Sequence, residues 1–281
     1  MGATGWRDRT TCALWVAILG ALILLVPDRA LAQGGPPLIT DDPDTPGPGY
    51  WEINLASIVE RARSARRIEA PLADINYGVG ARIQLKFEIP WLSGSETGQP
   101  MQAAPGNANM GVKWRFLGAE GQRIAWSTYP QLEVNTGHRA VSNGLVEEGR
   151  RFFLPTELTV QMGSVEINGE VGRTFVQNGE DGWVYGISTE IEFDGGFELL
   201  GELHGEQNRP APTELIVNIG GRKHLTRQLR LLMAAGTGVH GSEDDRVRLR
   251  IYVGLQLNLP DEYTLSQRRS VDIKPLNSRG R

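Results

Sequence analysis

Only a few stretches of this chain hold residue types that could catalyse a reaction. His138 and Ser142 lie together in a Gly/Asn-rich stretch, and a Ser/His pair is the minimum for acyl transfer. No third group that would orient the histidine is evident, so we expect a surface turn there and no catalytic site. A lipid hydrolase is the enzyme alternative that this pair leaves open.

Metal chemistry has two candidate positions. Asp41, Asp42 and Asp44 stand among prolines, and calcium prefers carboxylate oxygens, but aspartates at such close spacing commonly cap turns. His204 lies between Glu202 and Glu206, where we expect it to form hydrogen bonds rather than bind a metal. The sequence therefore predicts no metal site and no bound cofactor.

Most other charged residues alternate with apolar ones. In the stretch 81–90, Ile83, Leu85 and Phe87 point one way, whereas Lys86 and Glu88 point the other way. The stretch 107–116 repeats this pattern. A period of two over about ten residues is typical of a long β-strand with one apolar and one polar face.

Twelve candidate strands follow from this pattern, and their connections alternate in length. The connections after even-numbered strands are short, those after odd-numbered strands are mostly longer, and the two longest, 91–106 and 136–150, fall on the second side. Short turns at one end and long loops at the other are typical of outer-membrane barrels. The candidate strands are 50–60, 68–77, 81–90, 107–116, 124–135, 151–162, 165–176, 183–193, 197–206, 214–224, 229–237 and 246–259.

Strand length and aromatic placement indicate that the apolar face meets lipid. Spanning strands need about nine to eleven residues, and most of these stretches are that long. Aromatic residues near strand ends fit the two membrane interfaces; the expected anchors are Trp51, Trp91, Trp114, Trp126, Trp183 and Phe193. We therefore predict an all-β fold over 50–259, an antiparallel up-and-down transmembrane barrel of about twelve strands with short periplasmic turns and longer extracellular loops.

The two ends of the chain differ from the predicted barrel. Arg7 and Arg9, an apolar run and the small residues Ala30 and Ala32 predict a signal peptide over 1–32, cleaved after Ala32. A Pro-rich arm over 33–49 is expected to hang on the periplasmic side. The polar segment 260–281 is expected to be a disordered periplasmic tail. The only cysteine, Cys12, lies in the signal peptide, so neither a disulfide nor a cysteine metal site is expected in the exported chain.

Several motifs resemble one family in the same order along the chain. They are Thr40-Asp41-Asp42-Pro43, Pro48-Gly49-Tyr50-Trp51-Glu52-Ile53-Asn54-Leu55, Ile75-Asn76-Tyr77-Gly78, Gly111-Val112-Lys113-Trp114-Arg115-Phe116, Asn135-Thr136-Gly137 and Tyr252-Val253-Gly254-Leu255-Gln256. Over 36–259 the chain resembles the outer-membrane β-barrel family, often called transporters, that is associated with the meta-pathway of phenol degradation. The resemblance implies a barrel and the passage of small aromatic or otherwise hydrophobic solutes. The tail departs from the pattern, because such barrels commonly end on their last strand, and this puts the signal read by the assembly machinery in doubt.

The polar face of the predicted barrel separates charges into two arcs. We expect a basic arc of Arg82, Lys86, Lys113, Arg115, Arg222, Arg230, Arg248 and Arg250. Facing it, we expect an acidic arc of Glu157, Glu166, Glu170, Glu190, Glu192, Glu198, Glu202 and Glu206. Two interpretations stay open: a water-filled lumen with a transverse field, or a lumen plugged by salt bridges across that field, since twelve strands leave little width.

The favoured function is an outer-membrane channel for small solutes. Its expected partners are outer-membrane lipid, the barrel-assembly machinery and a small-molecule solute. The net charge of −4 gives no basic excess for a nucleic-acid partner. Besides the hydrolase, the alternatives are a closed structural or adhesion barrel without transport, and a soluble periplasmic β protein whose apolar face is a core.

Overall fold

The computed structural model describes residues 35–119, 122–208 and 213–260. The predicted signal peptide with Ala30 and Ala32 lies outside the described residues, and so does the predicted tail from residue 261 onward. No helix in the described part of the chain is long and apolar enough to cross a membrane.

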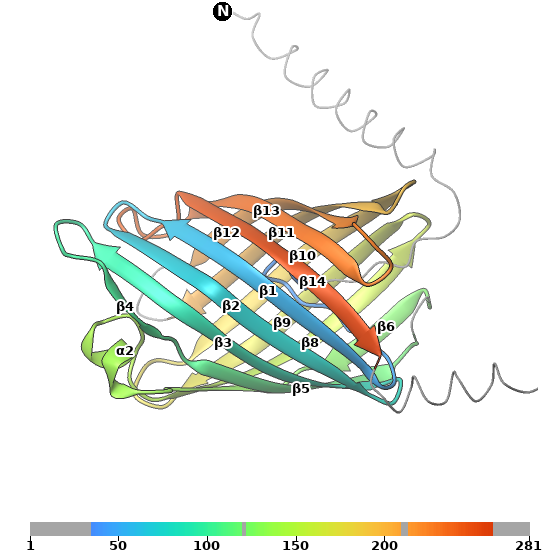
Figure 1. Cartoon of the computed structure of the whole chain (residues 1–281), viewed down its shortest axis with the longest axis horizontal. Coiled ribbons are helices and arrows are strands. Elements are labelled where there is room, and N and C mark those ends of the chain that lie inside the picture. Colours follow the sequence, from blue (N-terminus) through green and yellow to red (C-terminus); the bar gives the residue numbers. More distant parts are fainter. Residues whose placement is uncertain (1–34, 120–121, 209–212, 261–281) are drawn as a thin grey trace, which may run out of the picture.

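The described strands form one antiparallel sheet that closes into a barrel (Figure 1). β14 returns to pair with β1 along its whole length, from Tyr50 opposite Pro260 to Arg61 opposite Leu249. The strands are β1 (Tyr50–Arg61), β2 (Ala65–Val79), β3 (Ile83–Glu96), β4 (Gln102–Pro105), β5 (Ala108–Leu117), β6 (Ile124–Thr128), β7 (Gln131–Val134), β8 (Arg150–Met162), β9 (Val165–Val176), β10 (Gly182–Phe193), β11 (Phe197–Asn208), β12 (Glu214–His224), β13 (Leu229–His240) and β14 (Leu249–Pro260).

The barrel wall has twelve strands because two of them are interrupted. β4 and β5 both pair with β3 and are separated only by 106–107. β6 and β7 both pair with β8 and are separated by Tyr129 and Pro130. Proline has no backbone N–H to donate to a ladder. The predicted fold class, a twelve-strand antiparallel barrel, is confirmed.

The connections at the two ends differ less in length than the sequence indicates. At one end the turns are 80–82, 118–123, 163–164, 194–196 and 225–228. At the other end, the predicted loop 91–106 is largely strand, because β3 continues to Glu96 and β4 pairs with it. The predicted loop 61–67 shrinks to 62–64. The long connections at this end are 241–248 and 135–149, the second of which holds the short helix α2 (His138–Ser142), on the left of Figure 1.

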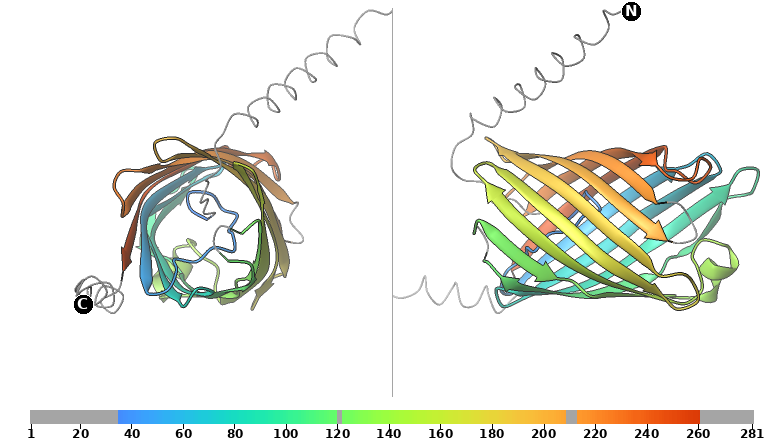
Figure 2. Two further views of the ribbon diagram at one scale, coloured as in Figure 1. Left: turned by 90° about the vertical axis from the view of Figure 1, so that its right-hand side faces the viewer. Right: turned by 180° about the vertical axis from the view of Figure 1, so that it is seen from behind.

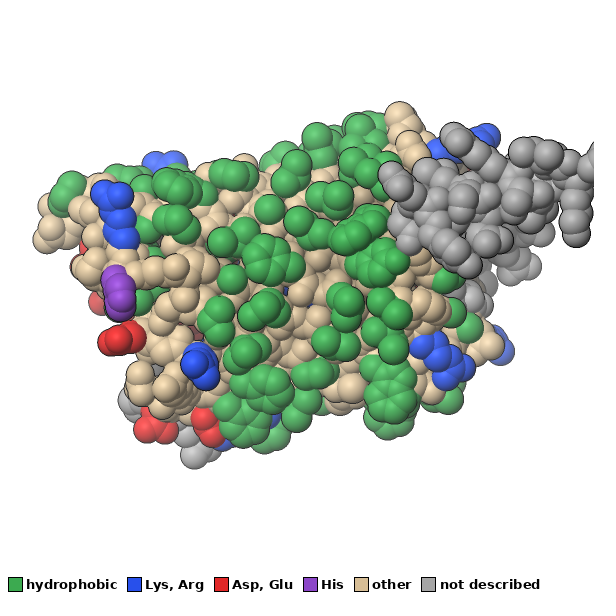
Figure 3. Space-filling view, turned by 60° about the horizontal axis from the view of Figure 1, so that its bottom comes forward, with side chains coloured by type: hydrophobic (Ala, Val, Ile, Leu, Met, Phe, Trp, Pro, Cys, Tyr) green, Lys and Arg blue, Asp and Glu red, His purple; other side chains and the backbone are tan. Residues whose placement is uncertain are grey.

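Alternation along the strands places apolar side chains outside. Leu55, Phe87 and Trp114 are exposed, whereas Asn54 and Lys113 on the same strands are buried. Apolar side chains cover the middle of the face in Figure 3, and charged ones gather near its ends. All six predicted interface aromatics are exposed. An outward apolar band with polar side chains inside is the pattern of a transmembrane barrel.

The inner face is not uniformly polar. Ile58, Leu72, Leu200, Leu232 and Tyr252 are buried inside the barrel with two alanines and Leu38. The strand periodicity did not predict this cluster, because it assigned apolar side chains to lipid. Leu38 belongs to the segment before β1, and its burial in this cluster shows that this segment lies in the lumen.

Candidate functional site

Residues 35–49, called the arm below, lie inside the barrel. Figure 2, seen from the short-turn end, shows this segment within the ring of strands. The arm meets the wall at that end, where the backbone N–H of Gly49 donates to the carbonyl of Gly78 at 3.0 Å. The expectation that the arm hangs on the periplasmic side is therefore wrong. The reason is that the arm's polar groups find complementary partners on the lumen wall.

Acidic wall residues accept hydrogen bonds from the arm's backbone. The Glu202 carboxylate accepts from the N–H of Ile39 at 2.9 Å and also from the N–H of Thr40. Glu170 accepts from the N–H of Asp41 at 3.3 Å. These bonds satisfy three N–H groups that would otherwise lie unpaired in the lumen, and a charged acceptor makes each bond stronger.

Basic wall residues bind the arm's carboxylates. The ammonium of Lys113, which is only 1% exposed, lies 2.8 Å from Asp41 Oδ1 and 3.8 Å from Asp42 Oδ1. It also donates to the carbonyl of Asp42. Arg115 donates to Asp44 Oδ1 at 2.7 Å. One side of the wall thus holds the arm by its N–H groups, and the other side holds it by its carboxylates.

Arg222 fastens the beginning of the arm. Its guanidinium donates to the carbonyl of Pro36 at 2.9 Å and to that of Gly35 at 3.3 Å. The same group forms ion pairs with Glu190 at 2.8 Å and Glu198 at 3.3 Å. Because all four partners share one buried guanidinium, Arg222 couples the arm to β10, β11 and β12.

The aspartates of the arm act as ion-pair partners and turn caps. Asp42 Oδ1 accepts from the N–H of Asp44 at 2.7 Å, as expected for a turn cap. Burial raises the pKa of Asp41, but the ammonium groups of Lys113 and Lys86, together with the hydrogen bonds that Asp41 accepts, outweigh this effect and hold that pKa below its usual value. For Asp42, burial outweighs the same ammonium and raises the pKa. No group of three metal-ligating side chains occurs within the described ranges.

Two wall glycines make room for the arm. A Cβ on Gly186 would lie 2.1 Å from Thr40 Oγ1, and a Cβ on Gly78 would lie 1.8 Å from the carbonyl oxygen of Gly47. Both distances are far below a normal contact, so any other residue at these positions would displace the arm or the wall.

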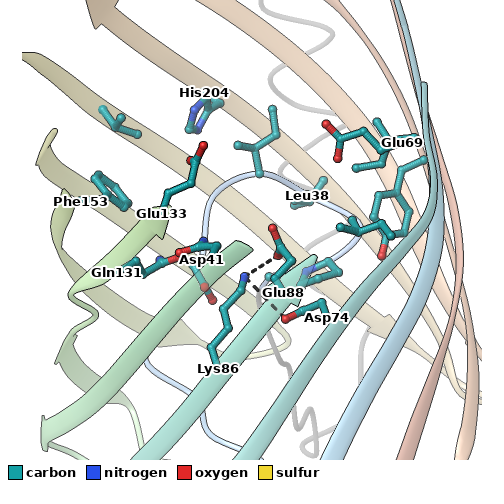
Figure 4. A pocket seen from close by; sticks show the side chains of 18 of the residues that line it. Leu38, Asp41, Glu69, Asp74, Lys86, Glu88, Gln131, Glu133, Phe153 and His204 are labelled. Atoms are coloured by element: carbon teal, nitrogen blue, oxygen red, sulfur yellow. Dashed lines mark hydrogen bonds and ion pairs between the residues drawn. The ribbon is translucent and has the colours of Figure 1, made fainter. Parts of the chain in front are cut away.

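A cavity of about 410 Å³ lies above the arm, toward the long-loop end. Figure 4 shows Leu38 and Asp41 of the arm beside it, and the Lys86 ammonium between Asp74 and Glu88. Eight carboxylates line the cavity against three permanently basic side chains. The carboxylates belong to Asp41, Glu60, Glu69, Asp74, Glu88, Glu133, Glu170 and Glu206, and the basic side chains to Lys86, Arg151 and Arg250. Fixed charge at this mouth is therefore predominantly negative.

The structure brings part of the predicted basic arc together. Lys86, Lys113, Arg115, Arg222 and Arg250 lie on the inner face, and half-buried Arg230 donates to Gln256. The other two assignments are wrong, since both side chains are exposed outside the wall strands. Arg82 lies in the turn 80–82 and donates to the carbonyl of Phe116, and Arg248 lies in the connection before β14, which begins at Leu249.

The predicted acidic residues lie on the inward positions of β8 to β11. Glu157, Glu166, Glu170, Glu190, Glu198 and Glu202 are buried, and Glu192 and Glu206 are half-buried. Some of the ion pairs join neighbouring strands, as in Arg250 with Glu60 at 3.6 Å, and others join the wall to the arm. Arg151 of β8 and Glu206 of β11, which are not neighbouring strands, also pair at 3.6 Å beside the cavity. The sequence left open a water-filled lumen and a lumen plugged by salt bridges across it. The structure matches neither fully, because the arm occupies the centre of the lumen.

The residues considered for catalysis or metal binding have other partners. The Ser142 hydroxyl donates to the carbonyl of Arg139 within α2, and His138 is exposed. The His204 ring is buried, with Nδ1 3.5 Å from Thr40 Oγ1 and Nε2 3.5 Å from Glu206. His204 therefore belongs to the contact between the wall and the arm.

Comparisons with known proteins identify the fold. No protein-family model matches the chain, and no curated protein does. An outer membrane channel from Pseudomonas putida F1 matches 81% of this chain and 100% of its own, with a TM-score of 0.61 at 11% identity. The KdgM porin matches 73% and 98%, with a TM-score of 0.52 at 10% identity, and the NanC porin 74% and 100%, with a TM-score of 0.51 at 8% identity. The chain has the barrel fold of these outer-membrane proteins.

The residues that sequence reasoning missed are those of the arm. Its composition did carry a signal, because three aspartates close together complement Lys113 and Arg115, which alternate on one strand. The prolines marked the segment as irregular without indicating where it lies. Nothing in the sequence distinguishes Gly78 and Gly186 from ordinary strand glycines, because only their closeness to the arm makes a side chain unacceptable there.

Proposed function

We propose that this protein is an outer-membrane channel for small solutes that its N-terminal arm closes. The single observation that carries the proposal is the occupied lumen. A segment outside the sheet fills the centre of a barrel whose wall carries charged groups directed at that segment. Barrels of this fold stand in the outer membrane with their short turns in the periplasm, which would put the cavity above the arm at the extracellular mouth.

The kind of contact favours an arm that can leave. Besides the buried side chains of Pro37, Leu38 and Pro43, the arm is held by hydrogen bonds and ion pairs, which water can replace once the arm moves out. A barrel that served only as a structural element could fill a narrow lumen with side chains of its own wall. The known structures of similar fold are named as a channel and porins, which supports a channel over a hydrolase or an adhesion barrel.

The cavity indicates which solutes would enter. Its excess of carboxylates attracts cations and repels anions. Leu38, Ile58, Leu72, Phe153 and Tyr252 supply apolar surface in the same cavity. We infer a preference for small solutes that are neutral or cationic and carry an apolar part. The aromatic or hydrophobic solutes implied by the family resemblance satisfy the apolar requirement.

Planar-bilayer recordings test the proposal with two proteins, the native chain and a variant lacking residues 35–45. We expect the native barrel to be mostly closed with brief openings, and the variant to show large, long-lived steps. Swelling of liposomes in small sugars or amines should follow the same order. Heat-modifiable gel migration controls for folding. A folded variant without any conductance steps would refute the channel and support the closed structural barrel.

A further inference from the structure

Two arginines at the long-loop end of the outer wall have the same charge and directly opposite positions. Arg61 ends β1, and in the register of β1 with β2 it lies opposite Arg66. Both residues are exposed. Glu52, Asn54, Ala56 and Ile58 of β1 are buried inside the barrel, so the alternate positions that end with Arg61 face outward. Directly opposite residues share a face, so Arg66 faces outward as well.

Neither guanidinium has an anionic partner within the described ranges of the chain, where no carboxylate lies at ion-pair distance from Arg61 or Arg66. Their neighbours, in contrast, are paired. Arg67 binds Glu69 at 3.1 Å and Arg63 binds Glu243 at 3.4 Å. Glu60 and Glu69, the acidic residues nearest to the pair on the same two strands, line the cavity on the other side of the sheet.

Such a pair costs stability unless something neutralises it. Like charges directly opposite each other in an antiparallel ladder repel, and the neighbouring basic residues show that carboxylate partners occur elsewhere on these strands. The arginines also lie at the border of the apolar band. The next outward-facing pair toward the membrane is Val59 with Ile68. Leu249 lies opposite Arg61 on β14, and Trp91 on the adjoining β3 is 46% exposed.

We propose that Arg61 and Arg66 bind a phosphate carried by a lipid headgroup in the outer leaflet. A guanidinium offers a planar fork that fits phosphate oxygens in a bidentate manner, and two opposed forks match a dianionic phosphate. The position of the two arginines at the edge of the apolar band favours a lipid over free phosphate, because Val59, Ile68 and Leu249 would contact the acyl chains of the lipid. In an outer membrane the phosphorylated lipid of that leaflet is lipid A. This inference rests on the outer-membrane placement in the proposed function, but not on conduction.

The test uses the refolded full-length barrel in a zwitterionic detergent and measures lipid binding by native mass spectrometry. Three probes are compared: lipid A with both phosphates, the same lipid dephosphorylated, and inorganic phosphate alone. We expect only the first to bind detectably. The double variant Arg61→Ser/Arg66→Ser should bind it about tenfold more weakly or worse, the effect of losing charge-assisted bonds in the absence of a replacement. The matched control is Arg82→Ser, an exposed arginine at the opposite end of the barrel.

Each result decides for or against the site. Equal binding by the native chain and the double variant, or equal binding of the dephosphorylated lipid, would overturn the proposal. Inorganic phosphate that binds as well as the lipid would overturn the assignment to a lipid. If the serine variant does not fold, Arg61→Lys/Arg66→Lys replaces it, and this variant should bind more weakly than the native chain because an ammonium lacks the fork; unchanged affinity would refute the pair. If the barrel conducts but binds no lipid, only the lipid site is refuted. If it binds lipid but never conducts, only the proposed channel is refuted.

Discussion

Replacing Lys113 with methionine should release the arm. Lys113 forms ion pairs with both Asp41 and Asp42 of the arm, and its ammonium also lies 3.8 Å from Glu157. Methionine keeps most of the side-chain volume but removes the charge. With the arm in place, the buried carboxylates of Asp42 and Glu157 and the half-buried carboxylate of Asp41 would then lose this ammonium.

The expected size of the effect follows from burial. Removing one partner of a buried ion pair costs about 3–5 kcal/mol, mainly because the other charge stays buried and unpaired. Glu157 belongs to the wall and stays in the lumen in either state, so only the two arm carboxylates favour the open state by moving into water. Taking the lower end, about 3 kcal/mol, the ratio of open to closed channels should rise about a hundredfold.

Single-channel recording measures that ratio directly as open probability. The native chain, Lys113→Met, Asp41→Asn/Asp42→Asn and the triple variant form a double-mutant cycle. We expect Lys113→Met alone to open the channel most, and the triple variant to close again in part, because neutral amides need no cation. Arg82→Met serves as a control, since its exposed side chain does not contact the arm.

The reasoning fails if Lys113→Met folds, as judged by heat-modifiable migration, and its open probability equals that of the native barrel. It fails equally if the cycle shows no coupling between Lys113 and the aspartates, because the argument requires that the ammonium acts through them.

Three further outcomes are expected. Gly186→Ala places a Cβ against Thr40 Oγ1, and the overpacking, which costs about 1–3 kcal/mol, should raise the open probability. Gly169→Ala is the control, since nothing lies within 4 Å of its Cβ, and it should leave the open probability unchanged. Equal behaviour of the two variants would contradict the steric argument. In a potassium chloride gradient the reversal potential of the open barrel should indicate cation selectivity, which Glu133→Gln reduces; anion selectivity would refute the interpretation of the cavity. Arg222→Met should lower the thermal stability of the barrel and not only release the arm, because Glu190 and Glu198 are left without their cation, and an unchanged melting temperature would count against that role.

The sequence by itself determined the barrel. Alternation is a property of the β backbone, so each strand shows its two faces locally, and the residues exposed to lipid, such as Leu85 and Trp114, follow from it. The acidic residues of β8 to β11 lie on the inner face for the same reason. Strand ends are less determined, because a ladder continues for as long as its neighbour continues. For this reason β3 and β4 occupy most of a predicted loop, and Arg248 lies outside the last strand.

Only the tertiary structure decided what the lumen contains. The contacts of Lys113 with Asp41, of Glu202 with Ile39 and of Arg222 with Pro36 join residues that no local pattern relates. They exist because closure of the barrel brings opposite arcs of charge within reach of one inserted segment. The alternation of a strand shows which way a side chain points, but it carries no information about what stands in front of it.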